Sequence, residues 1–457
     1  MLLSSAATMA AIRGSAQNNG QRPNILMIPI DDLNDWIGAL GGHPQTITPN
    51  LDRLARSGVL FSNAHCQAPA CNPSRASLMS GIRPTTSAVY RNGDLWRDGL
   101  PDAITLPEHF RAGGYYVAGG GKTFHGSQND LSVWDDYYSF EPQVLPPNRP
   151  VNGIPKAAHF DWSPVDAADD ETADTKLAHW AADFLRQDHD KPFFLACGFF
   201  RPHLPWYAPK KYFDLFPPEQ TNLPEVLAND LDDVPPAAKS RSRRDHDNVT
   251  STNQWKKAVA SYLACINYTD ANVGRVLDAL EGSAYADNTV IVLWSDHGWQ
   301  LGEKQQWRKF TLWERSTRVV MMMTAPGVTV PGGVCDRPAE LLDIYPTLSE
   351  LCGLPVRPEL EGKSLIPLLK NPDAAWDKAA ITSNGPDKTT VRTQRWRYSS
   401  FSDGEELYDH DNDPNEWSNL AGDPQHAELK ERMKGYMPSN VNRKKLKQYV
   451  RPPSRET

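Results

Sequence analysis

Residues that could do chemistry follow four short apolar runs of this chain, each at the point where a run ends. They are three carboxylates, three histidines and a lysine: Asp31, Asp32, Lys122, His125, His203, Asp296 and His297. In open α/β sheets, ligands bind beyond the carboxyl ends of the strands. One aspartate pair after a strand is more often a loop or cap than a ligand, but four such ends together indicate one shared site.

The carboxylates in this set suggest a site for a hard metal cation. Asp31, Asp32 and Asp296 offer the oxygen ligands that Ca²⁺ and Mg²⁺ prefer in proteins. His297 is a less typical ligand for such an ion and could instead hold a carboxylate in place. The alternative is a carboxylate cluster that is neutralised by Arg and Lys side chains.

A cysteine lies at the start of a second group of candidate residues. Cys71–Arg75 reads Cys-Asn-Pro-Ser-Arg, and Leu78–Gly81 reads Leu-Met-Ser-Gly. Pro73 suits the first turn of a helix and Gly81 a helix end, so Cys71 is expected just before a helix N-terminus. Helix N-termini favour anions, and a free cysteine there would be an activated thiolate. The plain alternative is a thiol in a turn.

The elements that must position these residues predict an α/β fold. Two helices have clear ends: one opens with Thr48 as N-cap and Pro49 as first residue and closes at Gly58, and a longer one covers Trp255–Leu280. Strands that alternate with helices imply a sheet covered on both faces. The apolar runs expected to form buried parallel strands are Asn24–Ile30, Tyr115–Ala118, Phe193–Phe199, Thr289–Trp294 and Val319–Met323.

Length and charge limit the possible functions. A chain of 457 residues can form one large domain plus a smaller one. Its net charge of -8 makes a nucleic-acid partner unexpected, and an anionic substrate would need a locally basic pocket. No apolar run approaches the ~20 residues of a membrane span. The six cysteines lack metal-like spacing, and Cys197 and Cys265 lie in apolar runs as expected for core thiols.

Composition divides the chain into three parts. Residues 1–20 are a possible signal or leader remnant, small and mildly apolar but without an early Lys or Arg, so export to the periplasm or the exterior is an expectation. Residues 21–375 are expected to form the catalytic domain, with Pro-rich loops at 128–170 and 216–254. Residues 376–457 are expected to form a subdomain of short strands, a helix near 426–436 and a basic tail.

Two clusters of Lys and Arg residues lie in these parts of the chain. In the second Pro-rich loop, Lys239, Arg241, Arg243 and Arg244 could be a solvated surface or a substrate-binding patch. The tail carries Arg443, Lys444, Lys445 and Lys447. His43, His65 and His109 match no motif and are expected to be structural or solvated.

The pattern that begins at Cys71, Cys-x-Pro-Ser-Arg followed by a small residue and Gly, resembles the sulfatase signature, in which the cysteine is oxidised to formylglycine after translation. The resemblance covers nearly the whole chain. Further segments similar to sulfatases, in the family's order, are Arg22–Leu26, Thr48–Asp52, Gly58–Phe61, Leu342–Thr347, Leu360–Leu365, Glu406–Asp409, Asp413–Glu416 and Asn419–Ala421.

Within the family, the chain looks most like the iduronate-2-sulfatases and their bacterial relatives. The segments that carry this likeness are Gly121–His125, Arg201–Trp206, Ser295–Trp299 and Trp307–Lys309. Ser80 stands where Thr is common, and Gln300 and Lys304–Gln306 also depart from the usual side chains. The resemblance therefore matches the catalytic positions without fixing the sugar.

The resemblance implies an alkaline-phosphatase-like fold, a large mixed sheet flanked by helices with a smaller C-terminal subdomain on a short antiparallel sheet. It also implies a sulfuric ester hydrolase that removes sulfate from a sulfated mono- or oligosaccharide, such as a uronate unit of a polysaccharide. A separate maturation enzyme would make formylglycine from Cys71. One Ca²⁺ would be held by Asp31, Asp32, Cys71, Asp296 and His297.

The resemblance further implies a role for each polar residue. Hydrated formylglycine at position 71 would attack sulfur while Asp296 accepts a proton, with Arg75 and Lys122 holding the diol. His203 and Lys309 would contact the sulfate and protonate or stabilise the leaving oxygen, and His125 would take the proton that restores the aldehyde. The residues expected to bind substrate are Lys122, His203, Lys309, Arg91 and Trp299.

Several alternatives remain open at this point. Arg308 is a rival to Lys309, Trp299 and Trp307 could be packing residues or sugar-stacking platforms, and Arg91, Asn92 and Trp96 could line the pocket. A phosphate or phosphonate monoester hydrolase could share the fold and the metal-bound nucleophile. A catalytically dead protein that only binds sulfated glycans would be expected to lack the nucleophile or a metal ligand.

Overall fold

The computed structural model of the chain describes residues 22–139, 141–155, 157–239 and 243–449. Within these ranges the largest element is a mixed sheet of eight strands in the order β13-β2-β12-β9-β1-β7-β4-β5. Its strands are β1 Asn24–Ile30, β2 Val59–Phe61, β4 Tyr116–Gly121, β5 Asp136–Tyr138, β7 Phe193–Gly198, β9 Thr289–Ser295, β12 Met321–Thr324 and β13 Gly333–Cys335. Neighbouring strands run parallel except at β12, which is antiparallel to both β9 and β2.

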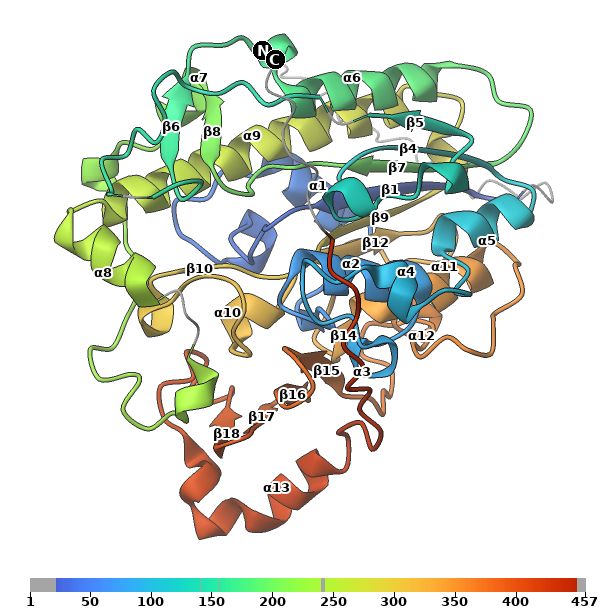
Figure 1. Ribbon diagram of the computed structural model, residues 1–457. Helices are drawn as coiled ribbons and strands as arrows, with labels where there is room; N and C mark the ends of the chain where they lie inside the picture. Colours follow the sequence, from blue (N-terminus) through green and yellow to red (C-terminus); the bar gives the residue numbers. More distant parts are fainter. Residues whose placement is uncertain (1–21, 140, 156, 240–242, 450–457) are drawn as a thin grey trace, which may run out of the picture.

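Helices cover both faces of this sheet (Figure 1). Side chains of β1 alternate between two cores, Leu26 and Ile28 on one face and Ile25 and Met27 on the other. The helices of the first face are α1 Pro49–Ser57, α6 Ala173–Arg186 and α9 Trp255–Glu281, and those of the second include α2 Cys71–Ser80, α5 Leu106–Ala112 and α11 Ile344–Leu351. The expected α/β sheet with both faces covered is confirmed.

Two strand predictions need correction. The run Val319–Met323 was expected to be parallel, but β12 is antiparallel, because an apolar run carries no information about its direction. The strand expected at Tyr115–Ala118 continues as β4 to Gly121. Glycine is needed there since a Cβ at Gly119 would lie 2.6 Å from the Trp134 ring, so the glycines belong to the strand and are not a loop after it.

The helix α1 begins and ends where the sequence predicts, but its N-terminus is capped by another element. Thr48 makes no side-chain cap bond. Instead the Asp270 carboxylate of α9 accepts the backbone N–H groups of Asn50 and Leu51 at 3.0 and 2.8 Å. Burial raises the pKa of Asp270 to about 6, although these bonds favour its charged form.

The Pro-rich stretches are not entirely loops. The first includes β5 and β6 Trp162–Val165, which pairs with β8 Trp206–Pro209. The second includes the helix α8 Arg243–Ser251. This helix is too polar for an apolar pattern to reveal it, and a contact with Arg308, described below, ties it to the fold. Arg241 lies outside the described residues.

A smaller antiparallel sheet follows the main sheet in the sequence. In the described part of the chain it has four strands in the order β15-β16-β17-β18, and the helix α13 Ala427–Lys434 packs near it. The strands are β15 Ala380–Ser383, β16 Thr389–Arg392, β17 Trp396–Phe401 and β18 Gly404–Asp409. The expected antiparallel C-terminal sheet is confirmed, whereas the domain limits 21–375 and 376–457 stay a prediction.

Other predictions concern the core and the termini. Cys197 and Cys265 are buried free thiols, as expected. His43, His65 and His109 are buried, which makes them structural and not solvated. Among the described residues, none of the helices has the length and apolar character needed to cross a membrane. The possible leader, residues 1–20, lies outside the described ranges.

Candidate active site

The ends of β1 and β9 bring the carboxylates together. These strands pair in register up to Ile30 and Ser295, so Asp31, Asp32 and Asp296 leave the sheet side by side. The backbone N–H of Asp32 donates to Asp296 Oδ1 at 3.1 Å. Asp32 has a left-handed φ of 58°, and the Tyr262 hydroxyl fixes this turn by donating to the Asp32 carbonyl at 2.7 Å.

The helix α2 places Cys71 against these carboxylates. Cys71 is the first residue of the helix and is fully buried. Its sulfur lies 3.3 Å from His297 Nε2, 3.8 Å from Asp32 Oδ1, 2.8 Å from Lys309 Nζ and 3.9 Å from Lys122 Nζ. Position 71 therefore lies within contact distance of a carboxylate, an imidazole and two ammonium groups.

Arg75, one turn into the same helix, holds the carboxylates in position. Its Nε donates to Asp296 Oδ2 at 2.9 Å and its NH2 group to Asp31 Oδ1 at 3.2 Å. Its NH1 group donates to the backbone carbonyls of Lys122 and Thr123. Because all three nitrogens are engaged, Arg75 links α2 to the ends of β1, β9 and β4.

The ammonium groups neutralise the carboxylates. Lys122 pairs with Asp31, and Lys309 Nζ donates to Asp32 Oδ1 at 2.5 Å. Burial disfavours the charged form of Asp31, but Lys122, Arg75 and Lys309 outweigh it and hold the pKa well below its usual range. Burial raises the pKa of Asp32 to about 7, because Lys309 offsets only part of the desolvation.

The three site histidines are neutral in this environment. Burial lowers the pKa of His125 to about 3 and that of His297 to about 4, and lowers the pKa of His203 well below its usual value. His297 Nδ1 lies 2.9 Å from the Gly298 carbonyl, which makes Nδ1 the donor and turns the Nε2 lone pair toward Asp32 and Cys71. His203 Nε2 faces Asp32 Oδ2 at 3.7 Å, and its side chain is 22% exposed.

The donor set fits a hard divalent cation. One ligand atom from each of Asp31, Asp32, Cys71, Asp296 and His297 lies within 4.8 Å of all the others. Asp32 Oδ2 is buried and has no hydrogen-bond partner among the described residues, as expected for an oxygen placed to bind an ion. Three carboxylates give the charge and the oxygen donors that Ca²⁺ requires, and the neutral Nε2 of His297 completes the set.

The expectation of an activated thiolate at Cys71 is wrong. Lys122 and Lys309 favour the thiolate, yet burial dominates and raises the pKa of the Cys71 thiol. The helix N-terminus and the two ammonium groups do not lower the pKa here because desolvation of the buried thiolate outweighs them, and Asp31 and Asp296 add to the rise.

Lys309, and not its neighbour Arg308, reaches Cys71. Arg308 is used elsewhere: its Nε donates to Asp245 Oδ2 of α8 at 2.7 Å, and its guanidinium lies over the Phe160 ring. Arg308 and Phe310 have φ values of 71° and 78°, in the left-handed region that favours glycine. The Phe310 N–H donates to the Pro69 carbonyl at 3.1 Å, which fixes this turn beside the start of α2.

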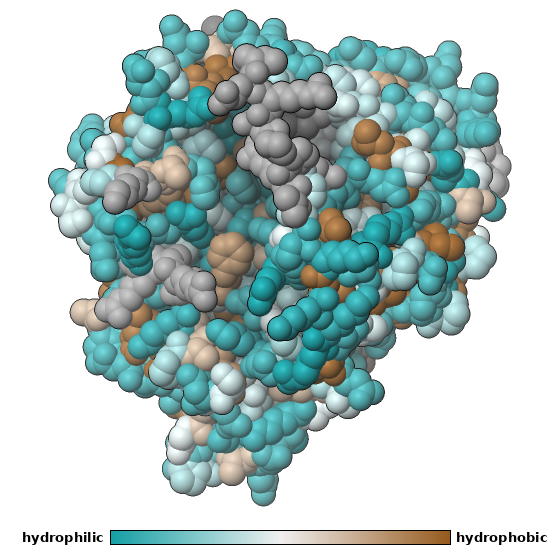
Figure 2. Space-filling model, in the orientation of Figure 1, coloured by the Kyte–Doolittle hydropathy of each residue, from teal (hydrophilic) through white to brown (hydrophobic). Residues whose placement is uncertain are grey.

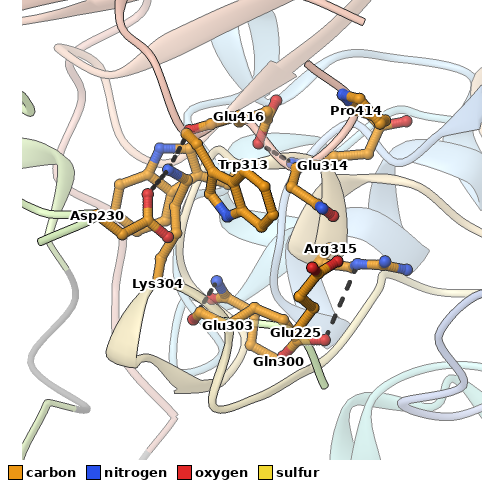
Figure 3. A pocket seen from close by; sticks show the side chains of 12 residues that line it. Glu225, Asp230, Gln300, Glu303, Lys304, Trp313, Glu314, Arg315, Pro414 and Glu416 are labelled. Carbon is orange, nitrogen blue, oxygen red and sulfur yellow. Dashed lines mark hydrogen bonds and ion pairs between the residues drawn. The ribbon is translucent and has the colours of Figure 1, made fainter. Parts of the chain in front are cut away.

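A buried lysine anchors the segment that carries Lys309 (Figure 3). Lys304 Nζ lies 2.7 Å from Asp230 Oδ1 and also donates to the Glu416 carbonyl. It lies over the rings of Trp313 and Tyr408 at 5.2 and 5.3 Å. The contact joins the second Pro-rich stretch, the Lys309 segment and the C-terminal subdomain in one place.

The remaining predicted site residues lie outside the charged cluster. Trp299 is only 2% exposed and packs its ring 5.4 Å below Lys309 Nζ, so it supports the lysine and does not present an open face to a sugar. Trp307 is buried as well. Arg91 is exposed beside Asn92, whose side chain accepts the Asn72 N–H at 3.0 Å.

Two supporting residues were not predicted to take part in the site. Tyr262 was predicted only to lie within the helix Trp255–Leu280, and Lys304 only to depart from the usual side chains. In the sequence, nothing about Tyr262 indicates a contact with Asp32, which is 230 positions away. Lys304 lies in a mixed polar stretch of the sequence, which gives no sign that its side chain is buried.

Comparison with known proteins decides the family. A family model described as Sulfatase matches residues 23–354, more than half of the chain. The chain belongs to the sulfatase family. A second model, described as N-sulphoglucosamine sulphohydrolase, C-terminal, matches residues 302–443. This sulfatase is therefore a hydrolase of sulfate esters, and the charged residues gathered around Cys71 all lie within the first match.

Individual relatives agree with this assignment. The sulfatase is 38% identical over 454 residues to a protein named Sulfatase from Formosa agariphila, which covers 92% of this chain and 87% of the relative. It is 33% identical over 405 residues to the mouse iduronate 2-sulfatase, covering 76% of this chain and 72% of that protein. Among solved structures, a 2-O GAG sulfatase superposes with a TM-score of 0.72 at 23% identity, covering 91% of both chains, which supports the alkaline-phosphatase-like fold.

Proposed function

We propose that this sulfatase removes a sulfate ester from a sulfated saccharide, with formylglycine formed from Cys71 and one bound Ca²⁺. The observation that supports this most is the position of Cys71. Its sulfur lies 2.8 Å from Lys309 Nζ and 3.3 Å from His297 Nε2, at the point where the carboxylates of two strands meet. A nucleophile at this position would have a cation site and two ammonium groups within reach.

The residues around position 71 suit the transfer of an anionic group. When present, the hydrated aldehyde supplies an oxygen nucleophile and the cation supplies positive charge beside the sulfate oxygens. Lys122 and Lys309 neutralise the charge that develops on the sulfate, since both are buried and remain protonated. Arg75 keeps Asp31 and Asp296 oriented.

Two histidines are assigned to proton transfer. His203 is partly exposed, so it can reach the oxygen that leaves with the sugar. A bound sulfate ester adds negative charge near its Nε2 and favours the protonated form, which can then donate to that oxygen. Nδ1 of His125 is buried without a hydrogen-bond partner among the described residues, and this neutral base is available to accept a proton.

The saccharide part of the proposal has support from relatives. Mouse iduronate 2-sulfatase carries a sugar acid in its name, and another similar protein from Formosa agariphila, 30% identical, is named an ulvan-active sulfatase. The catalytically dead alternative required the loss of a nucleophile or a metal ligand. All five predicted metal-site residues are present and lie together in the described structure.

Turnover of aryl esters tests the proposal. The protein should hydrolyse 4-nitrophenyl sulfate in the presence of Ca²⁺ and prefer it to 4-nitrophenyl phosphate, and a panel of sulfated mono- and disaccharides should then identify the sugar. Cys71→Ala should abolish turnover, whereas Cys265→Ala, a substitution of an equally buried core thiol, should not. Preference for the phosphate ester, or full activity of Cys71→Ala, would refute the proposal.

A further inference from the structure

The end of the described chain returns from the small subdomain to the catalytic domain (Figure 1). Residues 442–449, the dark red segment in front of α2, bind along residues 85–98, a loop that is flanked by the short helices α3 Pro84–Ser87 and α4 Trp96–Gly99. The Asn442 N–H donates to the Thr85 carbonyl at 2.7 Å, the Leu95 N–H to the Lys447 carbonyl at 2.8 Å, and the Tyr449 N–H to the Gly93 carbonyl at 2.6 Å. Backbone bonds therefore fix this segment to the loop at several points.

The same loop contacts the residue next to the nucleophile position. The Asn72 side chain donates to the carbonyls of Arg91 and Asp94 at 3.1 and 2.8 Å. The Asp94 carboxylate in turn accepts the N–H groups of Tyr90 and Arg91, both at 2.8 Å. Residues 85–98 thus contact both the terminal segment and the start of α2, so the terminal segment lies one chain segment away from position 71.

The side chains of this segment leave their positive charge in solvent. Leu446 is buried in the core and anchors the segment. Lys444, Lys445 and Lys447 are exposed, as is Arg91 of the adjoining loop. We call these four residues the basic ridge. Figure 2 shows that the surface in the place of the dark red segment is strongly hydrophilic.

Most of the ridge has no counter-ion. Lys444 donates to the Asp98 carbonyl at 2.9 Å, and its Nζ lies 3.9 Å from the Asp98 carboxylate. For Arg91, Lys445 and Lys447, no ion pair forms with any carboxylate of the described residues. The ridge therefore adds to the fold no ion pair other than that of Lys444 within the described residues. Such a concentration of positive charge is unexpected in a protein with a net charge of -8.

We propose that the basic ridge binds sugar units of a polyanionic saccharide next to the unit whose sulfate is cleaved. The inference rests on the proposed function and extends it to the class of substrate. A small monoester would be bound entirely by the buried cluster around Cys71 and would leave the ridge unused. A chain that repeats sulfate or carboxylate groups could place its next charges on the exposed basic side chains of the ridge.

Inhibition by chains of different length tests this proposal. The ridge variant is Lys444→Gln/Lys445→Gln/Lys447→Gln, and the control removes the same charge from three exposed positions elsewhere, Arg56→Gln/Lys191→Gln/Lys370→Gln. Heparin disaccharide and heparin octasaccharide would compete with 4-nitrophenyl sulfate at low salt. We expect the octasaccharide to inhibit the wild type more strongly than the disaccharide, and the ridge variant to raise its inhibition constant about tenfold. Turnover of the small ester should match the wild type in both variants.

Three results would overturn the proposal. The first is an octasaccharide inhibition constant that is unchanged in the ridge variant. The second is a loss of 4-nitrophenyl sulfate turnover in the ridge variant that is as large as its loss of octasaccharide inhibition. This would mean that the segment acts only by holding residues 85–98 in place. The third is equal, ridge-dependent inhibition by double-stranded DNA of matched charge, which would indicate nonspecific attraction. If the wild type hydrolyses no sulfate ester, the proposed function fails on its own, and calorimetric titration with the octasaccharide still tests the ridge.

Discussion

The Lys304→Met variant tests how the fold holds Lys309, the lysine that we propose stabilises the sulfate. The Lys304 side chain is 3% exposed and that of its partner Asp230 is 1% exposed, with 2.7 Å between Nζ and Oδ1. Removing one member of such a buried pair leaves the other uncompensated and costs about 3–5 kcal/mol. Loss of the anchor also frees the segment that positions Lys309, so turnover should fall together with stability.

The matched control removes both charges. In Lys304→Met/Asp230→Leu both buried charges are removed. Replacing a buried ion pair by apolar residues often leaves the free energy of unfolding nearly unchanged. We expect the double variant to recover most of the stability lost in the single variant. Its turnover should recover only in part, because a methionine side chain at position 304 has no N–H group to donate to the Glu416 carbonyl.

Urea unfolding followed by tryptophan fluorescence measures the stability, and 4-nitrophenyl sulfate turnover measures the activity. A single variant within about 1 kcal/mol of the wild type would refute the reasoning, since an exposed pair would behave in that way. Equal destabilisation in the single and double variants would also contradict it.

Further predictions concern the site and the subdomain. Lys309→Met should lower kcat by roughly a hundredfold or more, as expected for the loss of one donor that stabilises charge in the transition state. Steady-state kinetics measure this, and an unchanged kcat would assign the stabilisation of the sulfate to Arg308 instead. Chelation of Ca²⁺ should abolish turnover and lower the melting temperature, because a ligand that binds only the native state stabilises it. Added Ca²⁺ should restore both, and activity that survives exhaustive chelation would exclude a role for the metal in turnover. Burial raises the pKa of Glu406 to about 8 from a usual value of 4.5. The native state then holds more protons than the unfolded state between these values, so the free energy of unfolding should fall as the pH rises across this window. Glu406→Gln should make the free energy of unfolding, measured by urea titration at several pH values, depend less on pH. The same pH dependence in the variant as in the wild type would contradict the raised pKa of Glu406.

Much of the fold was predictable because its strands are buried and therefore apolar. The runs beginning at Asn24, Phe193 and Thr289 are central strands, and their positions in the sequence agree with the structure to within a residue. The direction of β12 was not predictable, because direction depends on how the chain returns to the sheet. Neither was the cap of α1, which comes from Asp270 in a helix far along the chain.

The candidate site, like the fold, was predictable from the sequence only in part. The residues that follow strand ends, Asp31, Asp32 and Asp296, could be predicted because parallel strands end at one edge. The supporting contacts could not, since they depend on packing between distant segments. The Lys304–Asp230 pair joins residues 74 positions apart and looks in sequence like ordinary polar surface. Burial also decides the state of Cys71. It raises the pKa of the thiol, although a cysteine at the start of a helix suggests a thiolate from the sequence.

The mass of the peptide that contains Cys71 tests the central claim most directly. Conversion of a cysteine to formylglycine lowers the mass by about 18 Da. We predict that the active protein carries this lighter peptide and that its fraction rises in proportion to specific activity across preparations. A fully active preparation in which Cys71 is entirely unmodified would contradict the account.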